Sequence, residues 1–267
     1  MNQNMIYDRI RVGTSGYSYD DWREVFYPAK LQKTLMLEYY SRFFNSVEIN
    51  ASYYTIPPAA VFERFAEKTP PDFEFIVKTH QETTHRRKEN AGALAKLLVA
   101  VNPLAVSGKF KGFLAQFPYA FKNNESNRKY IRETKKLIGN CPLFVEFRHD
   151  SWNREPVARF LSDNDIGYVN VDEPPLKGLL PVQELVTNNL GYIRFHGQNE
   201  KDWWDGKGSA RYDYSYQESE LEGWLIHISS ILKKAFKTYI FFNNHPGGKA
   251  VKNARQMIEL IKHGISP

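Results

Sequence analysis

The stretch LFVEFR, residues 143–148, carries the pattern on which the fold prediction rests. In it, apolar side chains alternate with the charged residues Glu146 and Arg148. A period of two residues is typical of a β-strand whose two faces meet different surroundings. The stretch YIRFH, residues 192–196, shows the same alternation, so the two segments are predicted to be strands of the same kind.

Eight strands are predicted in all, most of them rich in Val, Ile, Phe and Tyr. They span residues 10–15, 47–50, 73–78, 112–117, 143–148, 168–172, 192–196 and 239–243. Helical patterns lie between them, except that the segment after the sixth strand holds no convincing helix. Repeated alternation of strand and helix predicts a parallel sheet with helical crossovers. We therefore expect an α/β fold, a single (β/α)8 TIM-barrel domain over residues 1–267, with an open doubly wound sheet as the alternative.

The composition bounds the class of protein. Hydrophobic residues make up 42% of the chain and charged residues 25%, as in ordinary globular proteins. Cys141 is the only cysteine, so no internal disulfide can form, and residues 1–10 carry no apolar run typical of a signal peptide. No apolar run approaches the length of about 18 residues that indicates a membrane span. We expect a cytoplasmic protein with no membrane partner, whose net charge of +6 suits anionic ligands; the oligomeric state is not predicted.

A barrel strand turns one face to the surrounding helices and the other to the barrel axis. Since the helix-facing side is expected to be apolar, the polar residues of the alternating strands are predicted to point inward. They gather near the strand C-termini, where the active sites of barrel enzymes lie. In the sixth strand this polar set is Asn170 and Asp172. The inward candidates at the strand ends are Glu48, Asn50, Lys78, His80, Gln116, Glu146, Arg148, Asp172, Arg194, His196 and Asn243.

Six of these side chains are expected to line one cavity. They are Glu48, Lys78, Glu146, Arg148, Arg194 and His196. The alternative is a ring of structural ion pairs, such as Glu48–Arg194 or Glu146–Arg148. Burying charges is costly, and apolar residues would often fill the same space as stably, so a functional site is the favoured interpretation.

The loops that follow the strands place further aromatic and polar residues at the same end. They supply Tyr17, Tyr53, His149 and Trp152 and, within the long stretch 197–214, Trp203, Trp204, Arg211 and Tyr212. Aromatic rings on one rim suit stacking on a sugar or a base, and they equally suit ordinary packing over the barrel mouth. After the last strand, His245 precedes Gly247 and Gly248 at the start of a helix. Glycine amides there suit an anion, and a plain glycine turn is an equally good interpretation.

The residue types in the expected cavity limit the chemistry. His80, Glu146, Asp172, His196 and His245 are ligand types that suit zinc or manganese, but three cations would share the cavity and oppose a divalent metal. We therefore expect no metal and no other cofactor. Glu146 and Asp172 could form a glycosidase pair, yet Gln116 and Arg194 occupy the strands that carry the pair in many barrel glycosidases. No nucleophile elbow and no dinucleotide-binding glycine motif stands out.

The favoured hypothesis is an enzyme, a hydrolase or an isomerase, acting on a small or medium-sized anionic, ring-containing substrate. Lys78, Arg148 and Arg194 would bind the anion. His149 and His196 would transfer protons, oriented by Glu48, Glu146 or Asp172. The other expected substrate contacts are Tyr17, Asn50, Tyr53, Trp152, Arg211, Tyr212, Asn243 and His245. The alternative is a nucleic-acid-binding or processing protein, including a metal-dependent, endonuclease-like phosphodiesterase.

A set of short stretches runs through the chain in a recognisable order. They include VGTSGY (12–17), VEIN (47–50), FIVK (75–78), EFRH (146–149), YIRFHG (192–197), RYDY (211–214) and FNNH (242–245). On these residues the chain resembles the YecE-like family, known as domain of unknown function 72. The resemblance implies a TIM-barrel fold and no established activity. It also makes His85 a candidate site residue, because Thr84-His85 matches the family's Thr-His after the third strand.

Overall fold

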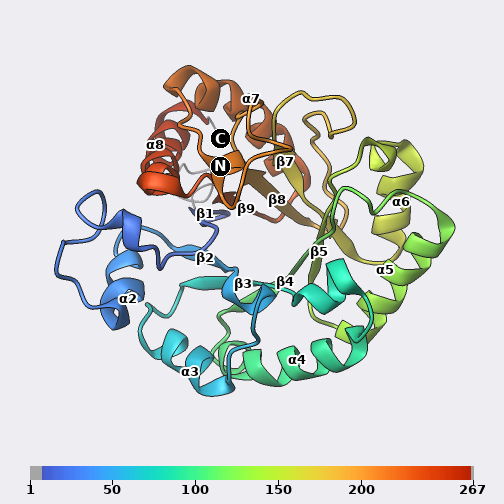
Figure 1. Ribbon diagram of the computed structural model, residues 1–267, viewed down its shortest axis with the longest axis horizontal. Coiled ribbons are helices and arrows are strands. Elements are labelled where there is room, and N and C mark those ends of the chain that lie inside the picture. The colour runs from blue at the N-terminus through green and yellow to red at the C-terminus, as the bar shows by residue number, and fades with distance from the viewer. Residues whose placement is uncertain (1–7, 266–267) are drawn as a thin grey trace.

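Parallel strands form the centre of the molecule, and helices surround them (Figure 1). The structure is a computed structural model that describes residues 8–265. The strands are β1 (Ile10–Thr14), β2 (Ser46–Ile49), β3 (Glu74–Lys78), β4 (Phe110–Gln116), β5 (Leu143–Glu146), β6 (Ile166–Tyr168), β7 (Asn170–Asp172), β8 (Leu190–Phe195) and β9 (Lys237–Phe242).

Two runs of paired strands close into one barrel. One run has the order β1-β9-β8-β7 and the other β2-β3-β4-β5-β6, and every pairing is parallel. β6 and β7 follow each other with only Val169 between them, so they act as one barrel strand. On the other side, a parallel bridge joins Ser15 to Glu48, and the Gly16 N–H donates to the Glu48 carbonyl at 2.7 Å. The predicted (β/α)8 barrel is therefore confirmed.

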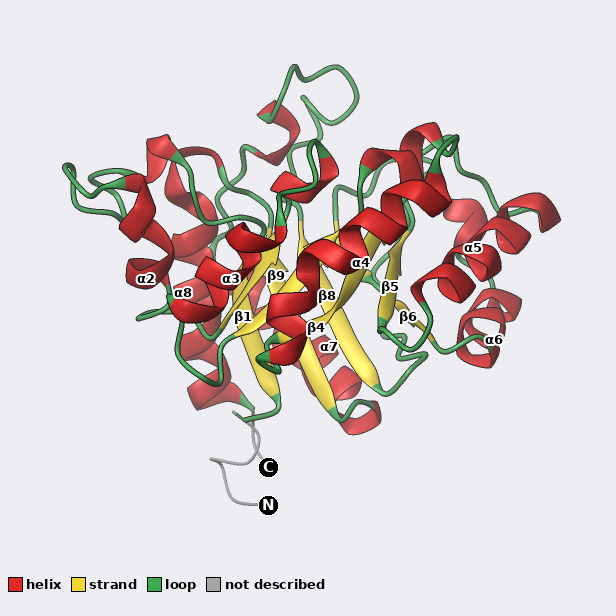
Figure 2. Ribbon diagram, turned by 90° about the horizontal axis from the view of Figure 1, so that it is seen from below, coloured by secondary structure: helices red, strands yellow, loops and turns green. Residues whose placement is uncertain are grey.

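The helices pack around the outside of the barrel (Figure 2). They are α2 (Met36–Tyr40), α3 (Ala59–Glu67), α4 (Asn90–Val106), α5 (Glu125–Ile138), α6 (Glu155–Asp163), α7 (Glu218–Lys234) and α8 (Lys249–Gly264). The segment 173–189, between β7 and β8, holds no helix, in agreement with the sequence pattern. No helix among residues 8–265 combines the length and apolar character needed to cross a membrane.

The helix ends follow from local sequence. At the start of α7, Gln217 and Glu220 form a capping box in which each side chain accepts from the other's backbone N–H. At the start of α5, the Asn124 side chain accepts from the Asn127 N–H at 2.9 Å, and Gly139, with φ of +66°, follows the last turn. These signals determine where α5 begins and ends and where α7 begins. They thereby also determine where the preceding loops end.

A buried carboxylate closes the N-terminal end of the barrel. The Glu74 carboxylate lies 2.5 Å from the Lys237 ammonium and accepts from the Tyr239 hydroxyl at 2.9 Å. Above this layer, the Tyr192 ring packs against Phe144 at 4.8 Å and against Phe241 at 5.5 Å between ring centroids. The barrel interior is thus filled below and in the middle, as in other small barrels, so a ligand site inside the barrel would lie at the C-terminal end.

Candidate functional site

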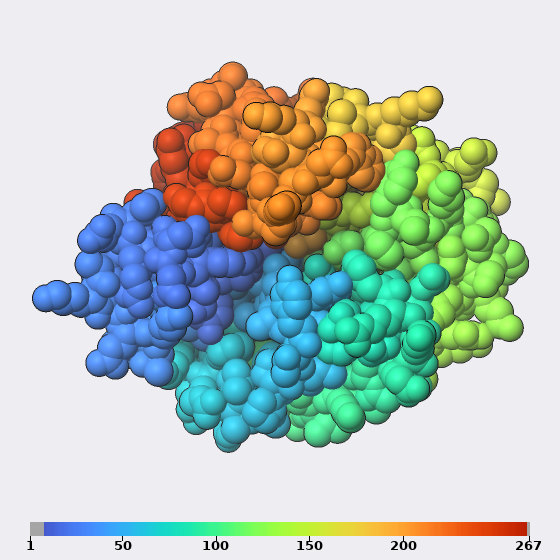
Figure 3. Space-filling model, viewed as in Figure 1, coloured from blue at the N-terminus to red at the C-terminus, as the bar shows by residue number. Residues whose placement is uncertain are grey.

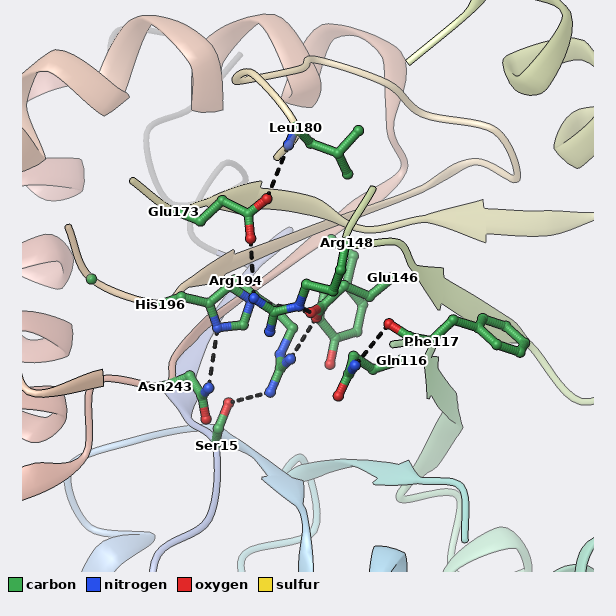
Figure 4. Close-up of polar contacts among 12 residues, drawn as sticks. Ser15, Gln116, Phe117, Glu146, Arg148, Glu173, Leu180, Arg194, His196 and Asn243 are labelled. Carbon is green, nitrogen blue, oxygen red and sulfur yellow. Dashed lines mark hydrogen bonds and ion pairs between the residues drawn. The ribbon is translucent and has the colours of Figure 1, made fainter. Parts of the chain in front are cut away.

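A network of buried charges lies at the C-terminal ends of β2, β5 and β8. Figure 4 shows its members Glu146, Arg148, Arg194 and His196. Arg194, on β8, is only 1% exposed. Its guanidinium donates to Glu146 at 2.5 Å, to Glu48 at 2.7 Å and to the Ser15 hydroxyl at 3.2 Å. A planar fork of N–H donors suits this arrangement, because it reaches two carboxylates on different strands at once.

Glu146 is the shared partner of the network. Its second oxygen lies 2.7 Å from Nε of Arg148 and 3.2 Å from Nε2 of His196. Burial acts against ionisation of this carboxyl, but Arg148 and Arg194 outweigh it and hold its pKa well below the usual range. Glu146 is therefore a carboxylate at neutral pH, balanced by the two guanidinium groups.

The ion pairs Glu48–Arg194 and Glu146–Arg148, which the sequence left open as a structural alternative, are both present. Glu48 also accepts from the Tyr192 hydroxyl at 2.6 Å. Glu48, Glu146 and Arg194 are all at most 1% exposed. These three residues therefore hold one another below the floor of the site and present no surface to a ligand.

His196 is fully buried beside the same network. Its Nδ1 lies 3.1 Å from the side-chain nitrogen of Asn243. Burial, and next the positive charge of Arg148, lowers the pKa of His196 to about 3. The ring is neutral near pH 7, so the proton-transfer role predicted for it has no support in this geometry, and its contacts indicate a positioning role next to Glu146.

A cavity of about 190 Å³ opens above the network. It is lined by His85, Gln116, Pro118, Tyr119, Arg148, Leu179, Trp203, Trp204, Arg211 and Tyr212. These residues come from β4 and from loops after β3, β4, β5, β7 and β8. Figure 3 shows this face of the molecule hollowed near its centre, between the orange segments and the blue and green ones.

Two arginines present positive charge to the cavity. Arg148 is 8% exposed, and its guanidinium carbon lies 5.6 Å from the centre of the Trp203 ring. Arg211 is partly exposed and makes no hydrogen bond or ion pair with the side chains or backbone of residues 8–265. Beside it, the Tyr212 ring lies 5.8 Å from that of His196 and covers it. Arg211 is therefore free to bind an anion, and Arg148 can contribute one edge of its guanidinium.

A lysine and a histidine complete one side of the site. The Lys78 ammonium donates to the Gln116 side-chain oxygen at 3.1 Å and lies 4.7 Å from the centre of the Tyr53 ring. Burial, and next the charge of Arg194, lowers the pKa of Lys78 to about 8. His85 packs edge-on against Tyr53 at 5.1 Å, and burial together with the charge of Lys78 lowers its pKa to about 4.

Glu173 is a site residue that the sequence reasoning missed. One of its oxygens accepts from Arg148 at 3.0 Å and the other from the Leu180 N–H at 3.1 Å. Burial raises the pKa of Glu173 to about 7, although Arg148 opposes the shift. A correct assignment of inward and outward positions in the sixth strand would have found it, since it stands next to Asp172.

The inward orientation predicted for Asn170 and Asp172 is wrong. The Asp172 carboxylate accepts from the Trp224 indole N–H at 3.0 Å and from the Tyr216 hydroxyl, both on the helix side of the sheet. Asn170 bonds the backbone of Leu185, in the loop after β7. The prediction assumed an apolar helix-facing side, and here polar partners from the helix layer and that loop satisfy the buried groups instead. Asp172 is thus removed from the candidate catalytic residues.

Two aromatic residues predicted to contact substrate belong to the core. The Trp152 ring is 1% exposed, stacks on Phe147 at 3.9 Å and donates its indole N–H to the Phe121 carbonyl at 2.6 Å. The Tyr17 ring packs against Tyr40 at 6.2 Å and Phe65 at 6.0 Å, between the first helices. Neither ring faces the cavity, because each finds an apolar pocket in the helix layer.

His245, a predicted substrate contact, packs against Tyr19, which was not predicted to be a site residue. Tyr19 stacks on His245 at 4.5 Å and donates its hydroxyl to the Ser15 carbonyl at 2.7 Å. The Gly247 N–H, which suited an anion, donates to the carboxylate of Asp21 at 2.8 Å. The chain's own carboxylate therefore occupies the anion position at the start of α8.

The other predicted contacts lie near the cavity without lining it. Asn50 is partly buried at the end of β2, and Asn243 contacts His196. His149 accepts the Ser151 N–H on Nδ1 at 3.0 Å, and its ring lies 4.7 Å from that of Tyr119. His149 therefore lies beside the cavity, in contact with the lining residue Tyr119.

No group of three or more His, Cys, Asp or Glu side chains within residues 8–265 is arranged to hold a metal ion. Of the ligand types noted in the sequence, Glu146 and His196 lie together, and no third one in the described part of the chain joins them. Asp172 faces the helix layer, while Glu146 is engaged by Arg148 and Arg194. The described residues therefore do not fit a metal centre.

Replacing Glu173 by glutamine is expected to change how stability depends on pH. In the folded protein Glu173 keeps its proton up to about pH 7, whereas the unfolded chain releases it near its ordinary pKa of about 4.3. Wild type therefore loses stability as pH rises between these values, by up to about 1.4 kcal/mol per pH unit from this group. Denaturant unfolding of both proteins at several pH values would show the variant gaining on wild type over this range. A constant difference would contradict the raised pKa.

The fold and the site together define a class: a (β/α)8-barrel protein with a small, arginine-bearing cavity at the C-terminal ends of its strands. Residues 11–266 match the family described as "Protein of unknown function DUF72". The chain therefore belongs to the DUF72 family, and the resemblance noted in its sequence is confirmed.

Relatives are similar along most of the chain. The UPF0759 protein YunF of Bacillus subtilis is 33% identical over 278 aligned positions, covering 97% of this chain and 98% of that protein. A DUF72 family protein of Thermotoga maritima has a solved structure with 38% identity and a TM-score of 0.88, covering 95% of this chain and 99% of that one. A DUF72 family protein of Enterococcus faecalis has 25% identity and a TM-score of 0.85, covering 96% and 97%. None of these proteins is named for an activity.

Proposed function

We propose that this protein is an enzyme that binds a small, anionic, ring-containing substrate in the cavity at the C-terminal end of the barrel. The observation that carries the proposal is the cavity of about 190 Å³ with Arg148 and Arg211 on its wall and the rings of Trp203, Trp204 and Tyr212 around them. Arginine binds carboxylate and phosphate groups through paired N–H donors, and aromatic rings supply a face for a flat substrate.

The size of the cavity restricts the substrate. A cavity of roughly 150 Å³ accommodates a benzene molecule. About 190 Å³ therefore suits one six-membered ring with one small anionic group, and it is too small for paired nucleic acid. The size favours the small-molecule hypothesis over a nucleic-acid-processing one.

Glu173 is the acid or base in this proposal. Its side chain is buried next to Arg148 and does not line the cavity, so Arg148 has to move for Glu173 to reach a substrate. A group with a pKa of about 7 can both give and take a proton near neutral pH, which makes it effective in either role. Its bond from Arg148 ties it to the cavity wall, and its bond from Leu180 places it next to the lining residue Leu179. Glu48, Glu146 and His196 then serve as positioning residues that hold Arg148 and Arg194. Proton transfer of this kind suits a hydrolase or an isomerase.

Arg211→Met is expected to weaken binding of phenyl phosphate about 10- to 100-fold, because a hydrogen bond to a charged group contributes about 1.5–3 kcal/mol. The melting temperature is expected to stay the same, since Arg211 has no partner among the described residues. Titration calorimetry at fixed salt measures both proteins. The matched control is Arg255→Met on α8, where the guanidinium lies over the Phe43 ring, away from this cavity.

Two results would count against the proposal. One is unchanged affinity of Arg211→Met for phenyl phosphate. The other is tight binding of a single-stranded oligonucleotide that falls steeply with salt, with no binding of phenyl phosphate, since this is the behaviour of a nucleic-acid-binding surface.

A further inference from the structure

Lys78 differs from the buried or partly buried cations Arg148, Arg194, Lys109 and Lys237 in how few partners its charged group has. Arg194 and Arg148 each contact a glutamate, and Lys237 contacts Glu74. Lys109 donates to three oxygens, those of the Ala66 and Thr69 carbonyls and the Thr69 hydroxyl. The Lys78 ammonium, by contrast, makes one hydrogen bond, to the neutral oxygen of Gln116, and no ion pair within residues 8–265.

The reason for this isolation is that the nearest carboxylates are already engaged. Glu146 is held by Arg148 and Arg194, and Glu48 by Arg194 and Tyr192. The groups that act on the charge of Lys78 are these two glutamates, which favour the ammonium, and the two arginines, which disfavour it. Together with burial, the arginines prevail and lower the pKa of Lys78 to about 8, so a useful fraction of the amine is neutral near pH 7.

The amine is also within reach of the cavity. Lys78 is the last residue of β3, at the C-terminal end of the barrel; the residue is partly exposed and lies next to the cavity without lining it. Gln116, to which it bonds, lines the cavity, and so does His85, which packs against the Tyr53 ring below the ammonium. A lysine whose charge is disfavoured by neighbouring cations is the usual form of an amine nucleophile in enzymes.

We propose that Lys78 forms an imine with the carbonyl group of the substrate, so that the substrate class is an anionic aldehyde or ketone. The Nζ lone pair attacks the carbonyl carbon, a C–N bond forms, and the carbonyl π electrons move to oxygen. The two hydrogens of the neutral amine leave with that oxygen as water, and a C=N bond remains. No oxidant or reductant is consumed. The inference rests on the proposed function only for the anionic group, which Arg148 and Arg211 would hold.

The first test uses propanal, a neutral aldehyde, with cyanoborohydride as the reductant that traps any imine. Wild-type protein is labelled at pH 7 for short times, digested and analysed by mass spectrometry. Lys78 is expected to be alkylated at least about tenfold faster than the exposed Lys96, because a pKa near 8 leaves far more neutral amine than the ordinary value near 10.4. Lys109, buried with all its donors engaged, is the matched control and is expected to stay unlabelled. Labelling of Lys78 no faster than that of Lys96 would overturn the proposal.

A second test changes the neighbour of Lys78 and leaves the lysine in place. Gln116→Glu puts a carboxylate where the Gln116 oxygen lies, 3.1 Å from Nζ, and so raises the pKa of Lys78. Because only the neutral amine reacts, the labelling rate of Lys78 in wild type is expected to rise with pH, with a midpoint near pH 8. In Gln116→Glu the midpoint of this rise is expected to move to higher pH. At pH 7 the labelling rate is expected to fall roughly tenfold if the variant raises the pKa of Lys78 from about 8 to about 9. Gln256→Glu on α8 is the control; an unchanged profile in Gln116→Glu would contradict the inference.

A third comparison separates this inference from the proposed function. Glyoxylate and glyceraldehyde 3-phosphate carry a carboxylate and a phosphate, and the one that fits the cavity is expected to label Lys78 faster than propanal does, with inorganic phosphate competing. If propanal labels Lys78 and neither anion gives any advantage, the imine is supported and the anion site fails. If phenyl phosphate binds through Arg211 but propanal does not prefer Lys78, the anion site stands and the imine fails.

Discussion

Replacing Glu146 by glutamine is expected to lower the free energy of unfolding by about 3–5 kcal/mol, which is the usual cost of removing one partner from a buried ion pair. Glu146 lies between Arg148 and Arg194, with contacts of 2.7 Å and 2.5 Å. A neutral amide keeps the size of the side chain but leaves two buried guanidinium groups close to one another. Such repulsion in a site closed to water has no screening to relieve it.

Denaturant unfolding followed by circular dichroism measures this loss. The control is Glu133→Gln on α5, an exposed residue 3.9 Å from Lys129, where a change within about 0.5 kcal/mol is expected. Because the pKa of Glu146 is depressed, its contribution is present above the unfolded value of about 4.3 and is lost as pH falls toward the folded value. The gap between wild type and Glu146→Gln should therefore narrow in acid. Equal losses in the two variants would contradict the central role given to Glu146.

Trp152→Ala is expected to cost about 3–5 kcal/mol of stability, the range observed for truncating a large buried aromatic residue. The indole is stacked on Phe147 at 3.9 Å and donates to the Phe121 carbonyl, so its removal leaves both a void and an unpaired acceptor. Thermal melting and denaturant unfolding measure the effect.

Trp204→Ala is the matched control, since it removes the same side chain from the wall of the cavity. Trp204 is 45% exposed and lies 4.8 Å from the Tyr119 ring. Its loss should leave the melting temperature nearly unchanged and weaken phenyl phosphate binding instead. The reverse outcome, with Trp152→Ala stable and defective in binding, would restore Trp152 to the site.

The barrel was predicted from the repeated alternation of strand and helix, with an open doubly wound sheet left as the alternative. The period-2 alternation of apolar and polar residues supported the individual strand assignments. It also placed the polar residues of β2, β5 and β8 on the inner face, because there the helix-facing positions are Val, Ile and Phe. The same rule failed in the sixth strand, where both faces are buried and Trp224 and Tyr216 offer donors to Asp172 from the outside. Alternation alone cannot distinguish the inner face of a strand from its helix-facing face when the helix layer also supplies polar partners.

The composition of the site was harder to predict than its position. The sequence shows that Arg194 and Glu146 share a face, but which cations remain free depends on distances between strands that are 48 residues apart in the chain. In the sixth strand the inward and outward positions were assigned the wrong way round. For this reason Asp172 was chosen as a site residue and Glu173 was overlooked. Tyr19 follows a loop turn at Gly16, with φ of +86°, which no periodic pattern describes. Which charged side chains a ligand can contact depends on the ion pairs that form between residues distant in the chain.

The layers along the barrel axis have a consequence for engineering this molecule. The Glu74 layer and the aromatic layer of Phe144, Tyr192 and Phe241 form a foundation that does not depend on the loops above it. The exposed positions of segment 197–214 can thus be varied to seek new specificities, provided that the buried Trp203 is kept. The contacts of Arg148 with Glu146 and Glu173 lie outside this segment, so they continue to anchor the upper layer to the strands beneath it.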